Sequence, residues 1–370
     1  MNSLASVELL DNLIINQRTS DMPLYAQVRL ALSNLIDEYF DDGEQFWTEA
    51  VLTERLGVSK ITIRRAMQEL SREGVLVRRV SKGTVVRKSD ENKTTDYRVG
   101  IIAVCLGSEA SINDLIQECQ NRGRRADVFY VTETDTPSSI FAKVEHSPRQ
   151  IRFILLANPT DITRDLQRTF SQWRYHTVNI DTLIAGYPGA FVGVDDAAGI
   201  RLGVDHLIAL GHRRITLLVN EPMSHGTIVT RVNTFDDYTR ENQILEARVV
   251  HCSTSSWKDS FQAAYDNMPA VMGQRITPTA IFTVSDAGAF GVLKWCAENG
   301  VRVPQEVSVL GFDNISTGKF TQPALSTIAQ PHAEIVQKAL DLLHDASDEP
   351  THVLLPPTLL IRESTASVNS

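Results

Sequence analysis

After Arg98 the sequence alternates regularly between short apolar strands and helical stretches, and this pattern constrains the fold more than any other feature. One such helical stretch, Ala197–Leu210, ends at Gly211. The alternation is typical of parallel sheets with helices on both faces. Because the stretch to Ser370 is long for one sheet, we expect two doubly wound lobes. The strand-like runs are Val99–Val104, Asp127–Val131, Ile151–Leu156, His176–Ile180, Phe191–Val194, Ile215–Val219, Arg248–His251, Ala280–Val284 and Val307–Gly311.

The preceding segment, from about Pro23 to Arg87, predicts a small helical module. Its first helix is amphipathic, and a second, short helix carries Leu52 and Leu56 and stops at Gly57. Ser59 is a suitable N-cap for a third helix. The helical spacing that predicts the first helix involves Leu24, Val28, Leu32, Leu35 and Ile36. The apolar face of the third helix consists of Ile63, Ala66, Met67 and Leu70.

A β-hairpin follows the third helix, which Gly74 terminates. The runs VLVRRV and TVVRK form two short strands around Ser81–Gly83. Two helices joined by a tight glycine turn and followed by a hairpin indicate a winged helix-turn-helix. The next residues, SDENKTTDY, are polar and predict a linker. The predicted domains are an N-terminal extension (1–20), a winged helix-turn-helix (21–88), a linker (89–97) and the α/β domain (98–370).

Charge is distributed unevenly along the chain, whose net charge is −9 over 370 residues. Residues 55–88 hold ten basic and two acidic side chains, whereas residues 89–370 carry a net charge of −9. A block of this kind attracts nucleic acid, because neutralising phosphates releases counterions. A short basic block can equally be a solvated surface.

The outward face of the third helix carries side chains that suit DNA. Arg and Lys can bind guanine edges or phosphates, Gln can read adenine, and Thr can contact a phosphate or a thymine methyl. Ser59 could donate to a phosphate at the helix N-terminus. Arg78, Arg79 and Lys82 lie on or near the wing. Together these residues favour DNA binding. The outward-facing residues of the helix are Lys60, Thr62, Arg64, Arg65 and Gln68.

Three motifs in this module, PLYAQV (23–28), LTERLGVSKITIRRAMQELSREGVLVRR (52–79) and KGTVV (82–86), resemble the GntR family of bacterial regulators. The sequence departs from the family pattern at two positions. Ala50 stands where the family usually has a basic DNA-contacting residue, and Ser81 stands where glycine is usual. It implies that the DNA-contacting positions of the recognition helix are Ser59, Lys60, Thr62 and Arg64. It implies that the wing tip is Lys82, Gly83 and Thr84.

The large domain shows none of the catalytic motifs that we sought: G-x-S-x-G, a P-loop, H-E-x-x-H or a Rossmann glycine fingerprint. The nine histidines show no ligand spacing, and His206 and His212 are interpreted as structural. The four cysteines, at 105, 119, 252 and 296, fit buried thiols in a reducing compartment. No run of eighteen apolar residues occurs, and no basic residue precedes Arg18. We therefore expect a cytoplasmic protein that is not an enzyme, with no cofactor, metal or membrane partner.

Polar residues follow several strands of the large domain directly. Asp181 follows TVNI, Ser285 and Asp286 follow AIFTV, and Asp313 and Asn314 follow VSVLGF. Ligands of parallel α/β sheets bind beyond the carboxyl ends of the strands. Carboxylates, amides and an arginine suit a polyhydroxylated ligand such as a sugar. The alternative is that these residues cap helices or form turns. This alternative applies most strongly to Asp286 and Asn314.

The same domain resembles the LacI/GalR family over about Arg98 to Arg362. The matching stretches are VGVDDAAGIRLGVDHLIALGHRRITLL (192–218), PTAIFTVSDAGAFGVL (278–293), NGVRVPQEVSVLGFDNI (299–315) and LSTIAQP (325–331). The resemblance implies two lobes like those of periplasmic sugar-binding proteins, closing on a ligand between them. It implies that the effector contacts are Asp313, Arg231, Ser285, Asp181 and Gln330.

Three features depart from the family pattern. Ser285 stands where asparagine is frequent, and Asn233–Thr234 interrupt the usual small-glycine step after Arg231. The loop CLGSEASIND after the first strand is short and lacks the usual aromatic segment. Residues 88–97 contain no hinge helix, so DNA contact is expected to rest on the winged helix alone.

These resemblances together imply a homodimeric repressor of a carbohydrate-use operon, similar to the arabinose-repressor type of chimera. Its partner is expected to be a pseudo-palindromic double-stranded operator with half-sites ~34 Å apart. Ligand-driven closure of the lobes would change operator affinity by ~1–3 kcal/mol. The alternatives are a regulator that senses a purine or another small metabolite, and a solute-binding module without DNA binding. In the extension, Leu4, Val7, Leu10 and Ile14 have helical spacing, consistent with a packed helix or a disordered arm.

Overall fold

The computed structural model describes most of the chain in two compact units. One unit comprises residues 1–100, 134–152 and 168–176, and the other comprises residues 101–133, 153–167 and 177–370. The expected linker lies almost wholly outside the described residues. No helix in the described ranges is both long and apolar enough to span a membrane. The described residues are Leu10, 23–79, 83–87, 97–104, 109–132, 134–136, 139–140, 151–157, 161–172, 176–181, 189–244, 246–255, 259–273, 275–345 and 351–368.

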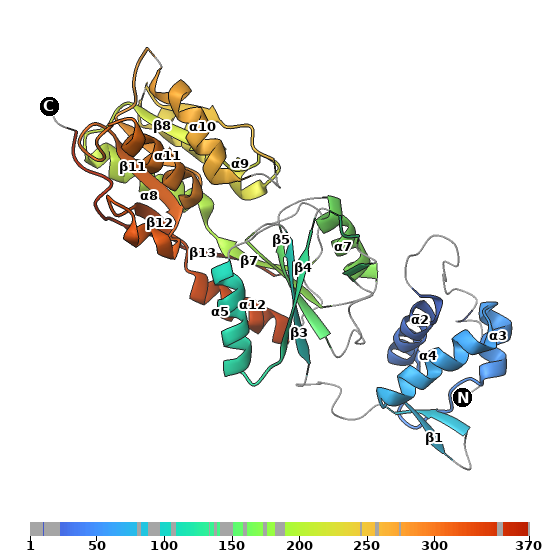
Figure 1. Cartoon of the computed structure of the whole chain (residues 1–370). Coiled ribbons are helices and arrows are strands. Elements are labelled where there is room, and N and C mark those ends of the chain that lie inside the picture. Colours follow the sequence, from blue (N-terminus) through green and yellow to red (C-terminus); the bar gives the residue numbers. More distant parts are fainter. Residues whose placement is uncertain are drawn as a thin grey trace. The chain divides into compact units, whose positions relative to one another are not determined.

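The N-terminal module is a winged helix-turn-helix (Figure 1). Ser59 caps α4 by accepting a hydrogen bond from the Thr62 amide, as predicted. Thr48 caps α3 in the same way, and Gly57 ends it in the left-handed conformation. Strands β1 and β2 pair antiparallel. The elements are α2 (Leu24–Tyr39), α3 (Glu49–Leu56), α4 (Lys60–Arg72), β1 (Leu76–Arg79) and β2 (Gly83–Val86).

The core of this module forms where the predicted apolar faces meet. On α4 the buried residues are Ile63, Ala66, Met67 and Leu70, as expected from their spacing. They pack with Val28, Leu32 and Ile36 of α2 and with an aromatic group of Phe40, Phe46 and Trp47. Leu10, the one described residue of the extension, is buried in the same cluster. The extension therefore packs on the module at this residue, whereas Leu4, Val7 and Ile14 lie outside the described ranges.

A buried arginine ties α2 to the end of α4. Arg29 of α2 donates to the Glu73 carboxylate, and its Nε lies 3.7 Å from Glu69 Oε2. Burial raises the pKa of Glu73, and the charge of Arg29 opposes that rise. Loss of Arg29 would leave the half-buried Glu73 carboxyl without its cation.

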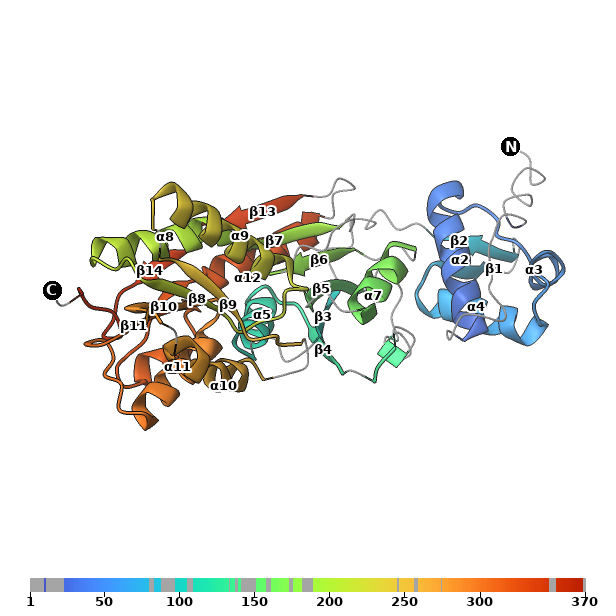
Figure 2. The same ribbon diagram turned by 90° about the horizontal axis from the view of Figure 1, so that it is seen from above.

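The first sheet of the large domain contains six strands in the order β13-β7-β6-β5-β3-β4 (Figures 1 and 2). Neighbours β13, β7, β6 and β5 run parallel. Helix α12 packs on β6, β7 and α5. The strands are β3 (Arg98–Val104), β4 (Ala126–Val131), β5 (Ile151–Ala157), β6 (Thr177–Ile180), β7 (Ala190–Val194) and β13 (His352–Leu355). The helices are α5 (Glu109–Asn121), α7 (Asp161–Gln172) and α12 (His332–Asp345).

The second sheet also has six strands, in the order β14-β12-β11-β10-β8-β9, and only β14 runs antiparallel to its neighbour. Alternate strand residues face α8 and α9 on one side and α10 and α11 on the other. The strands are β8 (Ile215–Val219), β9 (Arg248–His251), β10 (Ala280–Thr283), β11 (Ser308–Asp313), β12 (Ser326–Ala329) and β14 (Thr358–Leu360). The helices are α8 (Asp196–Ala209), α9 (Gly226–Glu241), α10 (Ser260–Met272), α11 (Asp286–Glu298) and the short η1 (Ser316–Phe320).

The predicted α/β class, with two doubly wound lobes and a winged helix, is confirmed. All nine expected strands are present, and β12, β13 and β14 join them. The two histidines are structural, as interpreted: His206 shares a hydrogen bond with the Thr365 hydroxyl, and His212 bonds Ser308 and the Ala366 carbonyl. Cys119 and Cys296 are buried free thiols, Cys252 is half-buried, and Cys105 is outside the described residues.

Candidate functional site

One face of α4 presents most of the residues predicted to contact DNA. Lys60, Arg64, Arg65 and Gln68 are exposed, and Thr62 is half-buried. The Ser59 hydroxyl is engaged within the helix, since it accepts from the Thr62 amide at 3.2 Å and lies 2.8 Å from the Thr62 hydroxyl. Ser59 therefore caps the start of the helix. To contact a DNA phosphate as predicted, the same hydroxyl would have to bond both Thr62 and the phosphate.

The two arginines of this face already have acidic or aromatic neighbours. Arg64 Nη2 lies 3.1 Å from Glu49 Oε2 of α3. The Arg65 guanidinium lies 3.6 Å from the centre of the Tyr25 ring, and its Nε is 3.8 Å from Glu69 Oε1. These contacts hold both side chains above the helix, and each arginine remains more than half exposed.

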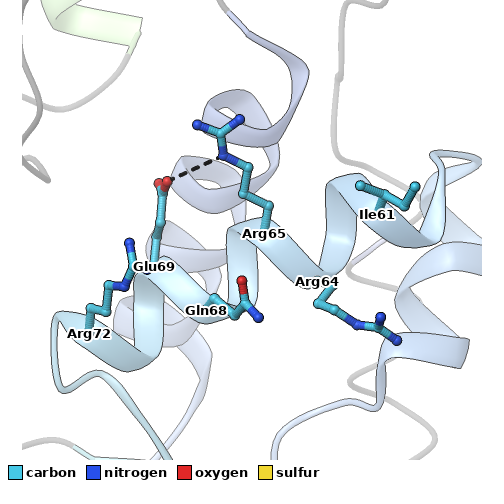
Figure 3. A pocket seen from close by; sticks show the side chains of 6 residues that line it. All are labelled: Ile61, Arg64, Arg65, Gln68, Glu69 and Arg72. Atoms are coloured by element: carbon cyan, nitrogen blue, oxygen red, sulfur yellow. Dashed lines mark ion pairs between the residues drawn. The ribbon is translucent and has the colours of Figure 1, made fainter.

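A shallow depression of about 440 Å³ runs along this face (Figure 3). Figure 3 shows its six lining side chains spread along α4, with Arg72 at one end and Ile61 at the other. Sequence reasoning missed Ile61, Glu69 and Arg72 as members of this surface. The lining residues are Ile61, Arg64, Arg65, Gln68, Glu69 and Arg72.

The wing presents a second exposed basic surface. Arg78 pairs with Thr84 and Arg79 with Gly83 across the hairpin. Arg78, Arg79 and Gly83 are exposed, and Thr84 is half-buried. Gly83 has a φ of 74°, a conformation that favours glycine. Lys82, predicted at the wing tip, lies outside the described residues.

A second candidate site gathers at the carboxyl end of β11. Asp313 Oδ1 accepts a hydrogen bond from Gln330 Nε2 at 2.7 Å and lies 3.6 Å from Arg231 Nη1. The backbone carbonyl of Asp313 is 3.3 Å from His332 Nε2. The structure thus brings together Asp313, Arg231 and Gln330, which come from three separate segments.

Arg231 is held rigidly beneath this cluster and is only 5% exposed. Its Nε donates to Asp196 Oδ1 at 2.7 Å, and its Nη1 donates to the Val284 carbonyl. The guanidinium also lies 3.6 Å from the centre of the Phe312 ring. The first residue of α8, Asp196, is thus the main partner of Arg231, and sequence reasoning missed it.

Ser285 extends the cluster toward β8. Its hydroxyl donates to Glu221 Oε1 at 2.8 Å and accepts from Asn220 Nδ2 at 2.6 Å. Neither Asn220 nor Glu221 was singled out from the sequence. Both directly follow β8, so the rule for strand ends could have found them.

Asp286 and Asn314 make structural contacts. This agrees with the alternative interpretation that they cap helices or form turns rather than bind a ligand. The Asp286 carboxylate accepts from the Ile315 amide at 2.7 Å and from the Thr327 hydroxyl at 2.6 Å. It therefore joins α11 to the ends of β11 and β12. The Asn314 side-chain oxygen accepts from Arg362 Nη2 at 2.7 Å.

The backbone at this site is strained. Asp181, Asp313 and Asn314 have φ values of 67°, 119° and 62°, which side-chain-bearing residues rarely adopt. Such conformations persist only where the surroundings enforce them, and they concentrate at ligand sites.

Burial dominates the electrostatics of the cluster. It raises the pKa values of Asp196, Asp313 and Glu221, and the nearby Arg231 charge opposes the rise in each. Burial also raises the pKa of Asp181 to about 6, and the charges of His332 and Arg231 work against it. The cluster therefore holds more buried carboxyl groups than one arginine neutralises.

Three oxygen atoms of the cluster have no hydrogen-bond partner among the described residues. They are Asp181 Oδ1, Asn220 Oδ1 and Gln330 Oε1. All three are acceptors, and buried acceptors without donors are costly. A ligand that supplies hydroxyl or amine donors would satisfy them.

Comparisons with known families match two separate parts of the chain. Residues 24–86 match bacterial regulatory proteins of the gntR family, and residues 204–365 match the periplasmic binding protein-like domain. The chain thus combines these two kinds of domain.

Similar individual proteins have related architectures. The arabinose metabolism transcriptional repressor of Geobacillus stearothermophilus is 24% identical over 94% of this chain and 99% of that repressor. The transcriptional repressor PurR of Haemophilus influenzae is 25% identical over 70% of this chain and 77% of its own length. Among solved structures, a LacI transcriptional regulator from a Rhodococcus species is 25% identical, with a TM-score of 0.64 over 73% of this chain and 99% of that one.

Proposed function

We propose that this chain, which joins a gntR-family winged helix to a periplasmic binding protein-like domain, is a ligand-responsive transcriptional repressor and not an enzyme. Its ligand is a sugar, and its target is the operator of a carbohydrate-use operon. The full-length similarity to the arabinose metabolism repressor supports both parts. The protein acts as a homodimer in the cytoplasm on a pseudo-palindromic DNA site.

The observation that carries the sugar assignment is the set of unpaired acceptors at the strand ends. Asp181 Oδ1 and Gln330 Oε1 lack donors among the described residues. The Asp313 carboxylate is the central, partly exposed member of the cluster, with 21% side-chain exposure. Adjacent hydroxyls of one sugar supply donors to several such oxygens at once.

Arg231 acts mainly through Asp313 in this proposal. Its contacts with Asp196, Val284 and Phe312 fix the guanidinium, and the fixed charge opposes the rise in the pKa of Asp313 that burial causes, which favours the carboxylate as an acceptor. Ser285 plays a similar part by orienting Glu221.

The charge of the cluster also selects the ligand class. Asp181, Asp196, Glu221 and Asp313 surround a single arginine in a buried setting. A phosphate or carboxylate on the ligand would add another negative charge, which this setting disfavours. We therefore expect an uncharged sugar rather than a sugar phosphate.

Regulation follows from a population shift between two states of the dimer. A sugar that binds one arrangement of the lobes more tightly favours that arrangement, and operator affinity changes by the coupling free energy, ~1–3 kcal/mol. The DNA-binding surface consists of the exposed face of α4 and the wing.

The effector is tested by thermal denaturation against pentoses, hexoses, disaccharides, sugar phosphates and purines. A ligand that binds only the folded protein raises its melting temperature by mass action. We expect a shift with an uncharged sugar, its loss in Asp313→Asn, and its retention in Asp237→Asn, which changes an exposed carboxylate on α9. A shift with a purine alone would favour the metabolite-sensing alternative.

DNA binding is tested by selection from a random double-stranded pool, followed by titration at several salt concentrations. Arg64→Ala should weaken binding and flatten the salt slope by roughly one unit per lost phosphate contact. Arg302→Ala removes an exposed arginine of the large domain and serves as the matched control. Equal binding by both variants and the wild type would argue against the winged-helix assignment.

A further inference from the structure

Ile61 is an isolated apolar side chain on the exposed face of α4. It is 80% exposed, whereas the other apolar residues of the helix, Ile63, Ala66, Met67 and Leu70, are buried. Ile61 is the second residue of α4, next to the cap at Ser59. It lines one end of the depression that Arg64, Gln68 and Arg72 continue (Figure 3).

A single exposed isoleucine is common and needs no explanation by itself. Here its position is informative, because every other residue that lines the depression is charged or polar. In helix-turn-helix proteins the first turn of the recognition helix lies against the base edges. The arginines behind Ile61 would face phosphates or guanine, so Ile61 would meet the bases at the front of the helix.

We propose that Ile61 determines part of the operator sequence by packing on the methyl group of a thymine. This inference rests on the proposed DNA-binding function. The thymine methyl is the apolar group that the major groove displays, and apolar side chains read it by contact. A cytosine amino group or a guanine oxygen at that position would lose water without gaining a hydrogen bond from isoleucine, which disfavours those bases.

The test removes only the methyl group. An operator is first selected from a random pool with the wild-type protein, and each thymine is then replaced singly by uracil. Wild-type affinity should fall about fourfold for one thymine in each half-site, the factor that corresponds to burial of one methyl-sized group.

The matched variants decide whether Ile61 is responsible. In Ile61→Ala the same uracil replacement should have little effect, and selection with this variant should lose its preference for thymine at that position. Phe320→Ala changes another exposed large apolar residue, 77% exposed on η1, and should behave like the wild type.

Two outcomes would overturn the proposal, and they differ from failure of the proposed function. Wild-type affinity that is indifferent to uracil at every position would refute it, and so would an equal uracil penalty in Ile61→Ala. If the wild type enriches no sequence from the pool, the DNA-binding function itself is refuted, and the role of Ile61 with it.

Discussion

Replacing Arg231 with methionine should destabilise the large domain severely. The substitution keeps much of the side-chain volume and removes the charge that faces Asp196 at 2.7 Å and Asp313 at 3.6 Å. Removing one partner of a buried ion pair typically costs about 3–5 kcal/mol, because the remaining charge stays buried. That is a large part of the ~5–15 kcal/mol that holds a domain together.

The loss of stability in Arg231→Met should be larger at high pH than at low pH. Burial already raises the pKa values of Asp196 and Asp313, and removal of Arg231 raises them further. A carboxyl group whose pKa is higher in the folded than in the unfolded state lowers stability where it is ionised. The cost therefore shrinks as the pH falls through the folded pKa, by up to about 1.4 kcal/mol per pH unit and group.

Calorimetry on the full chain at pH 8 and pH 5.5 measures both effects. Arg231→Met should show its largest deficit at pH 8, and adding Asp196→Asn should restore part of it. Arg240→Met, at an exposed position of α9, is the control and should change stability little. A deficit below about 1 kcal/mol at pH 8, or one independent of pH, would refute the reasoning.

Three further predictions concern single contacts. Burial raises the pKa of Asp286 to about 7, so its ionised carboxyl lowers stability more at pH 8 than at pH 5.5. The change in melting temperature from wild type to Asp286→Asn should therefore be more favourable at pH 8 than at pH 5.5. Equal changes at both pH values would contradict this. Glu49→Gln frees Arg64 and should steepen the salt slope of DNA binding by up to about one unit, whereas Glu306→Gln, which frees Arg302, should not change it. Gly203→Ala places a Cβ 2.5 Å from the Phe282 ring and should cost about 1–3 kcal/mol in chemical denaturation despite alanine's helix propensity, so a gain in stability would disprove the tight packing.

Local periodicity was enough to predict the helices of the winged module and nine strands of the large domain. The strands that it missed, β12, β13 and β14, are only three or four residues long. Two of them lie at sheet edges and pair with partners far away in the sequence, such as β13 with β7. Length alone does not explain this, because the four-residue strands β6, β9 and β10 were predicted. The missed strands are flanked by prolines, which indicate loops: Pro323, Pro331, Pro350, Pro356 and Pro357.

The candidate effector site was predicted at the strand ends but not in its supporting contacts. Asp313 was identified from its place after a strand, and Arg231 from the family resemblance. Asp196 was missed because nothing in a helix sequence shows which acidic residue turns toward a distant arginine. Arg29 was missed for the same reason, since its partners Glu69 and Glu73 lie on α4 and at its C-cap, far away in the sequence. Ile61 was missed because isoleucine suggests a core residue rather than a contact surface.

Residues 352–364 complete both sheets of the large domain. β13 supplies the edge of one sheet and β14 the edge of the other, and Ser364 then bonds both backbone groups of Val309. Neither sheet is complete until residues 352–360 have been synthesised. A chain cut short by a damaged message would retain a complete winged helix beside an unfinished large domain with bare strand edges. Such edges promote aggregation and proteolysis, so we expect a chain that ends before these residues to be short-lived.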